Sequence, residues 1–310
     1  MKIEFAFSLD YMDVVDANDA YDLFWSNTIK DKHNFECIGN DCTAQVTCAN
    51  LDKLWENMKK APYFKAYGEH SKNCSYLESQ VKYYSEQKSS ADSNCRGRIS
   101  NKAVDVLNFK RPKSHLEKNQ KYFQLNLEQQ LNLKIQRKKR AGSYSKKSRT
   151  KIDRYSIRPF IDNYYKYRQK QSLEDNYIKI KTAKLSYAEM FIEIDSQNVD
   201  DLPDYLRFYC GTARLYSHKT YYYILFDKCL ILNEEKIRPS IFVKHQIIEE
   251  AFCRSLIEKK FQSLSGSYIY CFIYAKPSVN SSNGKNYINF SANNLDYLEI
   301  KKDFSELYCI

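Results

Sequence analysis

Glycine and proline are scarce in this chain, whose 310 residues include only 7 Gly and 6 Pro. A loop that cradles phosphate groups needs several closely spaced glycines, so we do not expect one here. The sequence contains no Walker loop, no G-x-G-x-x-G, no H-E-x-x-H and no G-x-S-x-G. These absences remove the nucleotide-binding enzymes, zinc peptidases and serine hydrolases that such motifs define.

Long apolar runs are also missing. No stretch approaches the roughly 18 uncharged apolar residues that a membrane-spanning helix requires. The first residues, MKIEFAFSLDYMDVVDAND, carry Glu4 and have no apolar core of signal-peptide length. We therefore expect a cytoplasmic protein with no membrane partner, in which thiols stay reduced.

The chain is instead rich in cations, tyrosine and cysteine. Its net charge is +11, and it contains 27 Tyr and 10 Cys. A strongly basic protein often has a polyanionic partner, usually nucleic acid, although charge alone also fits an ordinary soluble protein. Four cysteines stand singly in apolar runs and are expected to be small buried side chains: Cys210, Cys229, Cys253 and Cys271.

The remaining cysteines of interest are grouped near the N-terminus. The spacing is C-x4-C at Cys37 and Cys42, then twenty-seven residues, then H-x3-C at His70 and Cys74. Thiolate and imidazole ligands suit zinc, and four protein ligands close a tetrahedral site with no position for a reacting water. We therefore predict one structural Zn²⁺. Cys48 follows the alternating run TAQVT and is expected to face inward as a spare thiol.

This region resembles the N-terminal part of the competence protein CoiA-like family. The resemblance is carried by EFAFSLDYMDVVDANDA, FECIGNDC, PYF and HSKNC, and it covers about the first 76 residues. It implies a zinc-ribbon-like domain. The chain departs from the family in the spacing of its cysteine pair. It also has Tyr63 where the family has its first histidine, and His70 lies further downstream.

Larger members of that family are considered nucleases, so the resemblance also implies an alternative function. A metal-dependent nuclease of this kind needs an acid on one strand and an E-x-K on the next. The best candidates are Glu299 and Lys301 in LDYLEIKK, with Glu193 and Asp195 about a hundred residues earlier. Surface charge at a strand end explains these residues equally well.

The middle of the chain is polar and basic. Residues 114–140 have the pattern of a helix, with Phe123, Leu127, Leu131 and Ile135 at four-residue steps. From Lys134 to Arg154 there are ten Lys or Arg and one acid. A run of this kind is usually a solvated linker, but it would also release counterions from polyphosphate. The predicted phosphate contacts are Lys138, Lys139, Arg140, Lys146, Lys147 and Arg149.

The C-terminal half has the pattern of a β-rich domain. A helix over SIRPFIDNYYKYRQKQSL precedes strand-like runs, one amphipathic helix over QIIEEAFCRSLIEKKFQSL, and two or three further strands. Three strands, a helix and two strands are the order of a five-stranded OB-type barrel. A two-layer α+β domain with a meander fits the same string.

An OB-type barrel binds single strands on the face of its second and third strands, where aromatic rings stack on bases and cations follow the phosphates. Because successive strand residues alternate in direction, Tyr222 should point inward when Tyr221 and Tyr223 point outward. A bulge would reverse this assignment. With so many tyrosines, some lie on the surface by chance. The predicted contacts are Arg214, Tyr216, Lys219, Tyr221, Tyr223, Phe242 and Lys244.

Together these patterns predict an α+β protein with three parts. They are a zinc-binding domain (1–76), a basic linker with a helix (77–155) and an OB-like β-barrel domain with one long helix (156–310). We expect a non-catalytic protein that binds nucleic acid, with single-stranded DNA or RNA favoured, in a bacterial DNA-processing or anti-phage system. The alternatives are a CoiA-like metal-dependent nuclease and an adaptor that binds a partner protein.

Overall fold

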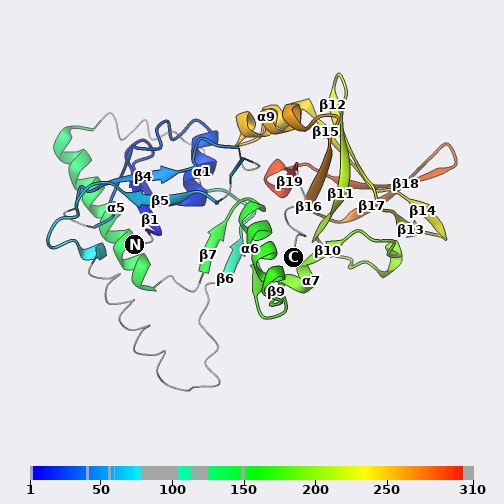
Figure 1. Cartoon of the computed structure of the whole chain (residues 1–310), viewed down its shortest axis with the longest axis horizontal. Helices are drawn as coiled ribbons and strands as arrows, with labels where there is room; N and C mark the ends of the chain where they lie inside the picture. Colours follow the sequence, from blue (N-terminus) through cyan, green and yellow to red (C-terminus); the bar gives the residue numbers. More distant parts are fainter. Residues whose placement is uncertain are drawn as a thin grey trace, which may run out of the picture. The chain divides into compact units, whose positions relative to one another are not determined.

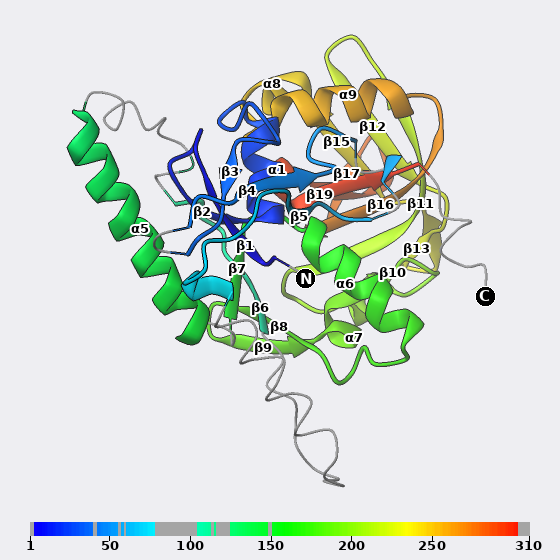
Figure 2. The same ribbon diagram turned by 60° about the vertical axis from the view of Figure 1, so that its left-hand side comes forward.

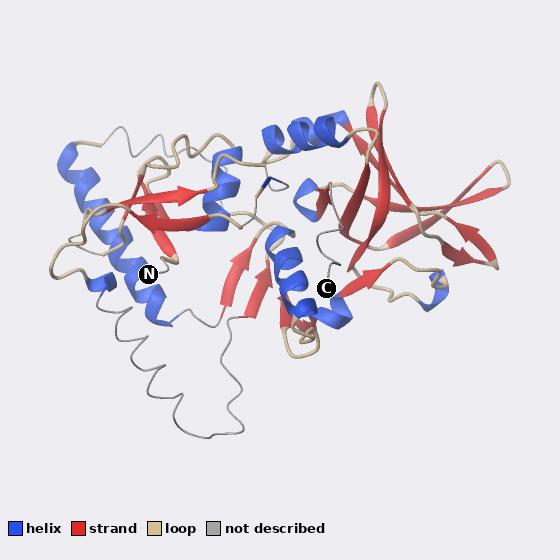
Figure 3. Cartoon of the chain, viewed as in Figure 1, coloured by secondary structure: helices blue, strands red, loops and turns tan. Residues whose placement is uncertain are grey.

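The computed structural model contains helices and several β-sheets, which confirms the α+β class (Figures 1 and 3). The chain divides into two compact units. The first comprises residues 1–53, 58–103 and 111–152, and the second comprises residues 54–57, 104–110 and 153–310. The structure describes residues 3–39, 42–54, 57–58, 60–77, 104–112, 115, 125–147 and 151–302.

The first unit is built on a five-stranded antiparallel sheet with the order β2-β1-β3-β4-β5. Helix α1 (Ala17–Trp25) follows β2 directly and is capped by Asp16, whose carboxylate accepts from the backbone N–H groups of Asn18 and Asp19. The strands are β1 (Phe5–Ser8), β2 (Asp13–Asp16), β3 (Phe35–Glu36), β4 (Gln45–Ala49) and β5 (Tyr63–Ala66).

Strand β4 brings two loops that are distant in the sequence together at one end of the strands of this sheet. It is antiparallel to both β3 and β5, with Phe35 opposite Val46 and Val46 opposite Ala66. The end of β5 therefore lies beside the start of β4, at the same end of the strands as the β3–β4 loop. Beyond β5, the N–H of Tyr67 continues the pairing by donating to the carbonyl of Gln45. Any residues carried by these two loops are thereby brought close together.

Helix α5 (Leu127–Lys147) belongs to the first unit and overlaps the helix predicted from the sequence. The predicted apolar face is wrong in part, because Leu127 is 85% exposed and Leu131 is 57% exposed. Phe123 lies outside the described residues. Cations of α5 make polar contacts with the rest of the first unit.

The second unit contains an eight-stranded sheet with the order β17-β18-β15-β12-β11-β16-β19, and β10 pairs with β11 outside this path. Most pairs are antiparallel, whereas β15 with β18 and β10 with β11 are parallel. Its strands are β10 (Phe191–Glu193), β11 (Arg207–Ser217), β12 (Tyr221–Phe226), β15 (Ser240–Lys244), β16 (Tyr268–Ala275), β17 (Pro277–Ser282), β18 (Lys285–Ser291) and β19 (Leu298–Lys301).

Two smaller sheets accompany it. One has the order β7-β6-β8-β9 and the other is the hairpin β13-β14. Their strands are β6 (Val104–Leu107), β7 (Lys151–Arg154), β8 (Tyr177–Ile180), β9 (Ala183–Ser186), β13 (Leu230–Leu232) and β14 (Glu235–Ile237). Residues 85–102, in the polar middle of the chain, lie outside the described residues.

Four α-helices of the described chain fall in the second unit: α6 (Arg158–Gln169), α7 (Tyr187–Met190), α8 (His245–Glu249) and α9 (Arg254–Leu264). Short 3-10 turns, η2 (Val199–Asp201) and η3 (Leu295–Tyr297), complete the unit. None of the helices described in either unit is long and apolar enough to cross a membrane.

The large sheet has an apolar core on each face. One core is formed by residues of β11, β12, β15, β16, β18 and β19 with Phe261 and Leu264 of α9. On the opposite face, Phe208 of β11 and Phe272 of β16 pack with residues of α6 and α7, such as Phe160. This second core covers only part of its face of the sheet. It does not include the outward residues Tyr216, Tyr223 and Phe242.

The predicted barrel differs from this sheet in two respects. The sheet has eight strands rather than five, and its described order leaves β17 and β19 as its two ends instead of closing. The predicted single long helix is two helices, α8 and α9, joined by a short break (Figure 2). The expected strands are nevertheless present, and the helices do lie between β15 and β16 in the chain.

Candidate metal centre and aromatic face

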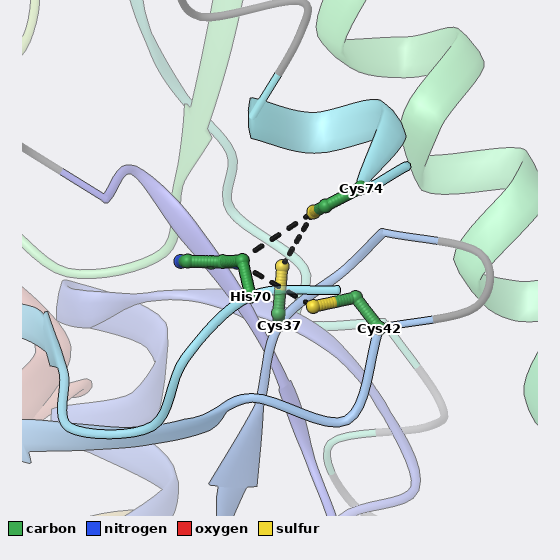
Figure 4. A group of neighbouring side chains, drawn as sticks. All are labelled: Cys37, Cys42, His70 and Cys74. Carbon is green, nitrogen blue, oxygen red and sulfur yellow. Dashed lines mark hydrogen bonds between the residues drawn. The ribbon is translucent and has the colours of Figure 1, made fainter. Parts of the chain in front are cut away.

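The four predicted ligands come together where the β3–β4 loop and the segment after β5 meet (Figure 4). The Sγ atoms of Cys37 and Cys74 are 3.6 Å apart, and His70 Nδ1 lies 3.4 Å from Cys42 Sγ and 3.6 Å from Cys74 Sγ. All four ligand atoms lie within 4.8 Å of one another. Tetrahedral bonds of about 2.3 Å would place ligands about 3.8 Å apart, so these residues could hold a metal ion.

Each half of the cluster is shaped by a tight turn. The Cys42 N–H donates to the Gly39 carbonyl in one turn, and the Cys74 N–H donates to the Ser71 carbonyl in the other. The Gly39 N–H also points at Cys37 Sγ, at 3.4 Å. Amide donors of this kind stabilise thiolate, the form of cysteine that binds metal.

The thiols of this cluster do not share one electrostatic environment. Burial raises the pKa of Cys37 far above its usual range. Burial also acts to raise the pKa of Cys42. There it is outweighed by backbone hydrogen bonds from Ala44 and Ser71 and by the Ser71 and His70 side chains, which lower the pKa to about 6. The second nitrogen of His70, Nε2, is buried and has no hydrogen-bond partner among the described residues.

Of the other cysteines that the structure describes, all but Cys229 are buried as expected of small core residues. Cys48 is fully buried in β4 opposite Phe64 and is not part of the cluster. Burial raises its pKa well above the usual range, as it does for Cys271 in the second unit. Cys210 and Cys253 are also buried, whereas Cys229 is half-buried.

Gly39 leaves no room for a side chain inside the cluster. A Cβ atom at this position would lie 2.7 Å from Cys74 Sγ and 3.1 Å from Cys42 Cβ. The Gly39→Ala variant must therefore push ligands apart, and we expect its zinc affinity to fall about 10- to 100-fold, the range seen when groups supporting metal ligands are changed. Competition with a chromogenic chelator measures this.

A matched control for Gly39→Ala is Gly211→Ala in β11. A Cβ there would meet Phe226 at 3.5 Å and Ile194 at 3.8 Å, which are ordinary contacts. We expect Gly211→Ala to keep the wild-type zinc affinity. Equal affinity in the Gly39 variant would show that the cluster opens freely around the ion.

A cation of helix α5 supports the same loop. The Nζ atom of Lys138 donates to the Cys42 carbonyl at 3.0 Å and to the Glu36 carboxylate at 3.2 Å. Lys134 Nζ lies 2.6 Å from the same carboxylate, and Arg137 donates to the carbonyl of Met12. The basic helix is therefore anchored next to the cluster through its cations.

This anchoring corrects one predicted phosphate contact. Lys138 is only 2% exposed, and its ammonium group is engaged by Glu36, so the prediction that it contacts nucleic acid is wrong. Burial lowers its pKa, against the attraction of Glu36. Lys139 is exposed and stays a prediction. Arg149 and the side chains of Arg140, Lys146 and Lys147 lie outside the described residues.

The second candidate site is a row of aromatic rings on the uncovered part of the large sheet. Tyr216 of β11 pairs with Tyr223 of β12, which pairs in turn with Phe242 of β15. Ring centroids are 6.1 Å apart for the first pair and 4.8 Å for the second. Tyr216 and Phe242 are 40% and 47% exposed. The row therefore runs across three strands and is open to solvent.

Further side chains extend this surface on both sides of the row. Tyr221 lies 5.6 Å from Phe242 between ring centroids, and His218 stacks on Tyr221 at 4.5 Å. Lys244 is exposed opposite Tyr221, and Lys219 is exposed in the β11–β12 turn. We define the aromatic face as Arg214, Tyr216, Tyr221, Tyr223, Phe242, Lys244 and Tyr268.

Tyr268 was not among the predicted contacts. It is 61% exposed at the start of β16, where it pairs with Arg214. The Arg214 guanidinium carbon lies 4.8 Å from the Tyr268 ring centroid and 5.8 Å from that of Tyr216. A strand was predicted after the amphipathic helix, but only the register of β16 with β11 reveals that Tyr268 shares the face.

The inward residues of the same strands fit the predicted alternation. Tyr222 is 9% exposed and packs against Phe261 of α9 and against His245, with ring centroids 4.9 Å and 5.1 Å away. The ladder from β12 to β15 runs through residues 221–225 without a bulge. Tyr221 and Tyr223 therefore share the outer side, as the alternation predicted.

The aromatic face carries no negative charge on its strands. The described outward positions of β11, β12, β15, β17 and β18 hold Tyr, Phe, Leu, Thr, Ser, Asn, Lys and Arg, but no Asp or Glu. No ion pair engages Arg214 or Lys244 within the described chain. The face is thus apolar and cationic at once.

The acidic residues considered for nuclease chemistry are engaged elsewhere. Glu299 is buried in an ion pair with Lys260, and Lys301 lies 3.5 Å from Asp162. Opposite them on β16 are Phe272 and Tyr270, so the neighbouring strand supplies no acid.

The two earlier acids also have partners, because Glu193 lies 3.6 Å from Arg168 and Asp195 lies 3.0 Å from Lys228. Within the part of the chain that the structure describes, the Cys/His cluster is the one group placed to hold a metal ion.

Comparisons with known proteins give no relative from which to transfer a function. No protein-family model, no curated protein and no solved structure matches the chain. The assignment therefore depends on the two sites described above.

Proposed function

We propose that the protein binds single-stranded nucleic acid through its aromatic face and uses its Cys/His cluster to hold a structural zinc ion. The observation that carries the first part is the acid-free row of exposed rings on β11, β12 and β15, flanked by cations. Bases stack on exposed aromatic rings without regard to sequence, and cations beside the rings bind phosphate.

Zinc is the metal that best fits the donor set. Three thiolates and one imidazole are soft to borderline ligands, which favour zinc over magnesium or calcium. Four protein ligands leave no position for a water that could react. The ion would therefore fix the β3–β4 loop to the segment after β5, and a zinc-ribbon-like domain related to the CoiA-like family is our interpretation of this unit.

The connectivity of the second unit supports an OB-type interpretation. β11, β12 and β15 form a meander, helices α8 and α9 follow, and β16 returns to pair with β11. OB-type folds are partly open and bind oligonucleotides on the surface of their second and third strands. On this interpretation those strands would be β12 and β15, which carry Tyr221, Tyr223 and Phe242.

The central test is substitution of the row. In Tyr223→Ala, the affinity for labelled single-stranded DNA or RNA is expected to fall by about 1 to 3 kcal/mol, because one stacking platform is lost. Fluorescence anisotropy measures the affinity. Duplex binding, which depends on charge, should change little.

The neighbouring residue gives the matched control. Tyr222→Ala removes a buried ring from the core around Phe261, so it should destabilise the unit by about 3 kcal/mol or more without a selective loss for single strands. Equal loss for duplex and single strand in Tyr223→Ala would indicate misfolding. Undiminished affinity there would disprove base stacking on this ring, and no binding of wild type to nucleic acid would favour the protein-binding adaptor.

A further inference from the structure

The aromatic row has two chemically different flanks. Arg214 marks one flank, because it lies on β11 two residues, or about 7 Å, before Tyr216 of the row. On the opposite flank, at a similar distance, Lys244 stands beside Tyr221. A single strand whose bases stack along the row must place its sugar–phosphate backbone toward one flank. The phosphates would then contact either Arg214 or Lys244.

Arg214 is held in place by its surroundings. Its guanidinium lies against Tyr268 and near Tyr216, and the residue is half-buried. Ordering a free lysine on a ligand costs side-chain entropy, whereas a stacked guanidinium is already largely ordered before the ligand arrives. Lys244 is exposed, and no such stacking contact holds it among the described residues.

Arg214 is also short of hydrogen-bond partners. Its Nε atom is buried and makes no hydrogen bond, and no carboxylate pairs with the guanidinium among the described residues. A cationic donor in this state gains more from an arriving anion than a solvated lysine does. The planar fork of a guanidinium also matches two oxygens of a phosphate group.

We propose that the Arg214 flank carries the sugar–phosphate backbone, with Arg214 bound to one phosphodiester and the base edges directed toward Tyr221 and Lys244. This inference rests on the proposed function and deepens it, because it assigns the ligand's orientation on the face. Arg214 is then the residue that sets the register of the strand on the row.

The experiment compares two variants that each remove one positive charge. Affinity for the shortest labelled oligo(dT) that binds fully is measured for Arg214→Gln and Lys244→Gln. Arg214→Gln is expected to lose about 10- to 100-fold, the range of a charge-assisted hydrogen-bonded contact, and Lys244→Gln less than about threefold. Arg214→Lys should still lose about tenfold, because it keeps the charge but not the fork.

Neutral methylphosphonate linkages, introduced one at a time, locate the bound phosphate. One linkage should weaken wild-type binding more than the rest, and that difference should vanish in Arg214→Gln but persist in Lys244→Gln. If instead the difference vanishes in Lys244→Gln, or both variants lose equally, the backbone does not lie on the Arg214 flank. No binding of wild type to any single strand would overturn the proposed function itself. Should Arg214→Gln misfold, Arg214→Lys and the linkage scan on wild type still decide.

Discussion

Removal of the metal is expected to unfold the first unit and to leave the second unit folded. A structural zinc site typically supplies about 10 to 16 kcal/mol of apparent binding free energy, which an apo domain of this size cannot replace. Without the ion, nothing would join the buried thiol of Cys37 to Cys74 and the rest of the segment after β5. The second unit has its own two cores, so its unfolding transition should stay in place.

Two measurements test this expectation. The purified protein should contain about one zinc per chain by elemental analysis, and Cys42→Ser should contain much less. Cys42→Ser should also lose the unfolding transition of the first unit, while the transition of the second unit remains. Cys48→Ala is the matched control, since this thiol is buried in the same unit but lies outside the cluster. Zinc-free wild type with an unchanged first transition would contradict the assignment.

The second large effect concerns the buried ion pair of Lys260 and Glu299. Their side chains are 4% and 5% exposed, so neither charge can be solvated if the other is removed. Glu299→Ala is therefore expected to destabilise the second unit by about 3 to 5 kcal/mol, measured by urea unfolding. The double variant Lys260→Met/Glu299→Leu should recover most of that loss, because apolar groups of similar size need no partner.

An exposed pair in the same unit provides the control. Asp195 and Lys228 are 62% and 50% exposed, and Asp195→Asn should cost less than about 1 kcal/mol. The experiment also separates structure from catalysis at Glu299. A stable Glu299→Ala protein that loses Mg²⁺-dependent cleavage of an oligonucleotide would overturn the structural role and restore the nuclease alternative.

Features encoded locally could be predicted from the sequence. The ligand types and spacings of Cys37, Cys42, His70 and Cys74 were sufficient to select the cluster. The inward position of Tyr222 followed from strand alternation, which depends only on neighbouring residues.

Features that depend on distant partners could not be predicted. Nothing in the charge run around Lys138 indicates that its partner is Glu36, which lies 102 residues earlier in the chain. The carboxylate turns a predicted phosphate contact into a buried ion pair.

The strand count failed for a different reason. β17 has the sequence PSVNSS, which lacks the apolar alternation that identifies strands. A signal was present, however, in the Asn283-Gly284 turn that joins β17 to β18. Both residues have positive φ, 51° and 72°, and Asn-Gly is the strongest short-range mark of a hairpin.

The long separation between Glu36 and Lys138 also bears on how the chain tolerates changes in length. Their contact spans 102 residues of the chain, which are not one flexible loop because they include β4, β5 and β6, the ligands His70 and Cys74, and Arg111 in its buried ion pair with Asp22. The entropy of closing a flexible segment between two such fixed points grows only with the logarithm of its length, so doubling that segment would cost only about 0.6 kcal/mol. A change of length between fixed points is therefore expected to cost little, whereas one that displaces a strand, a ligand or the lysine that α5 delivers to the Cys42 carbonyl removes the contacts themselves.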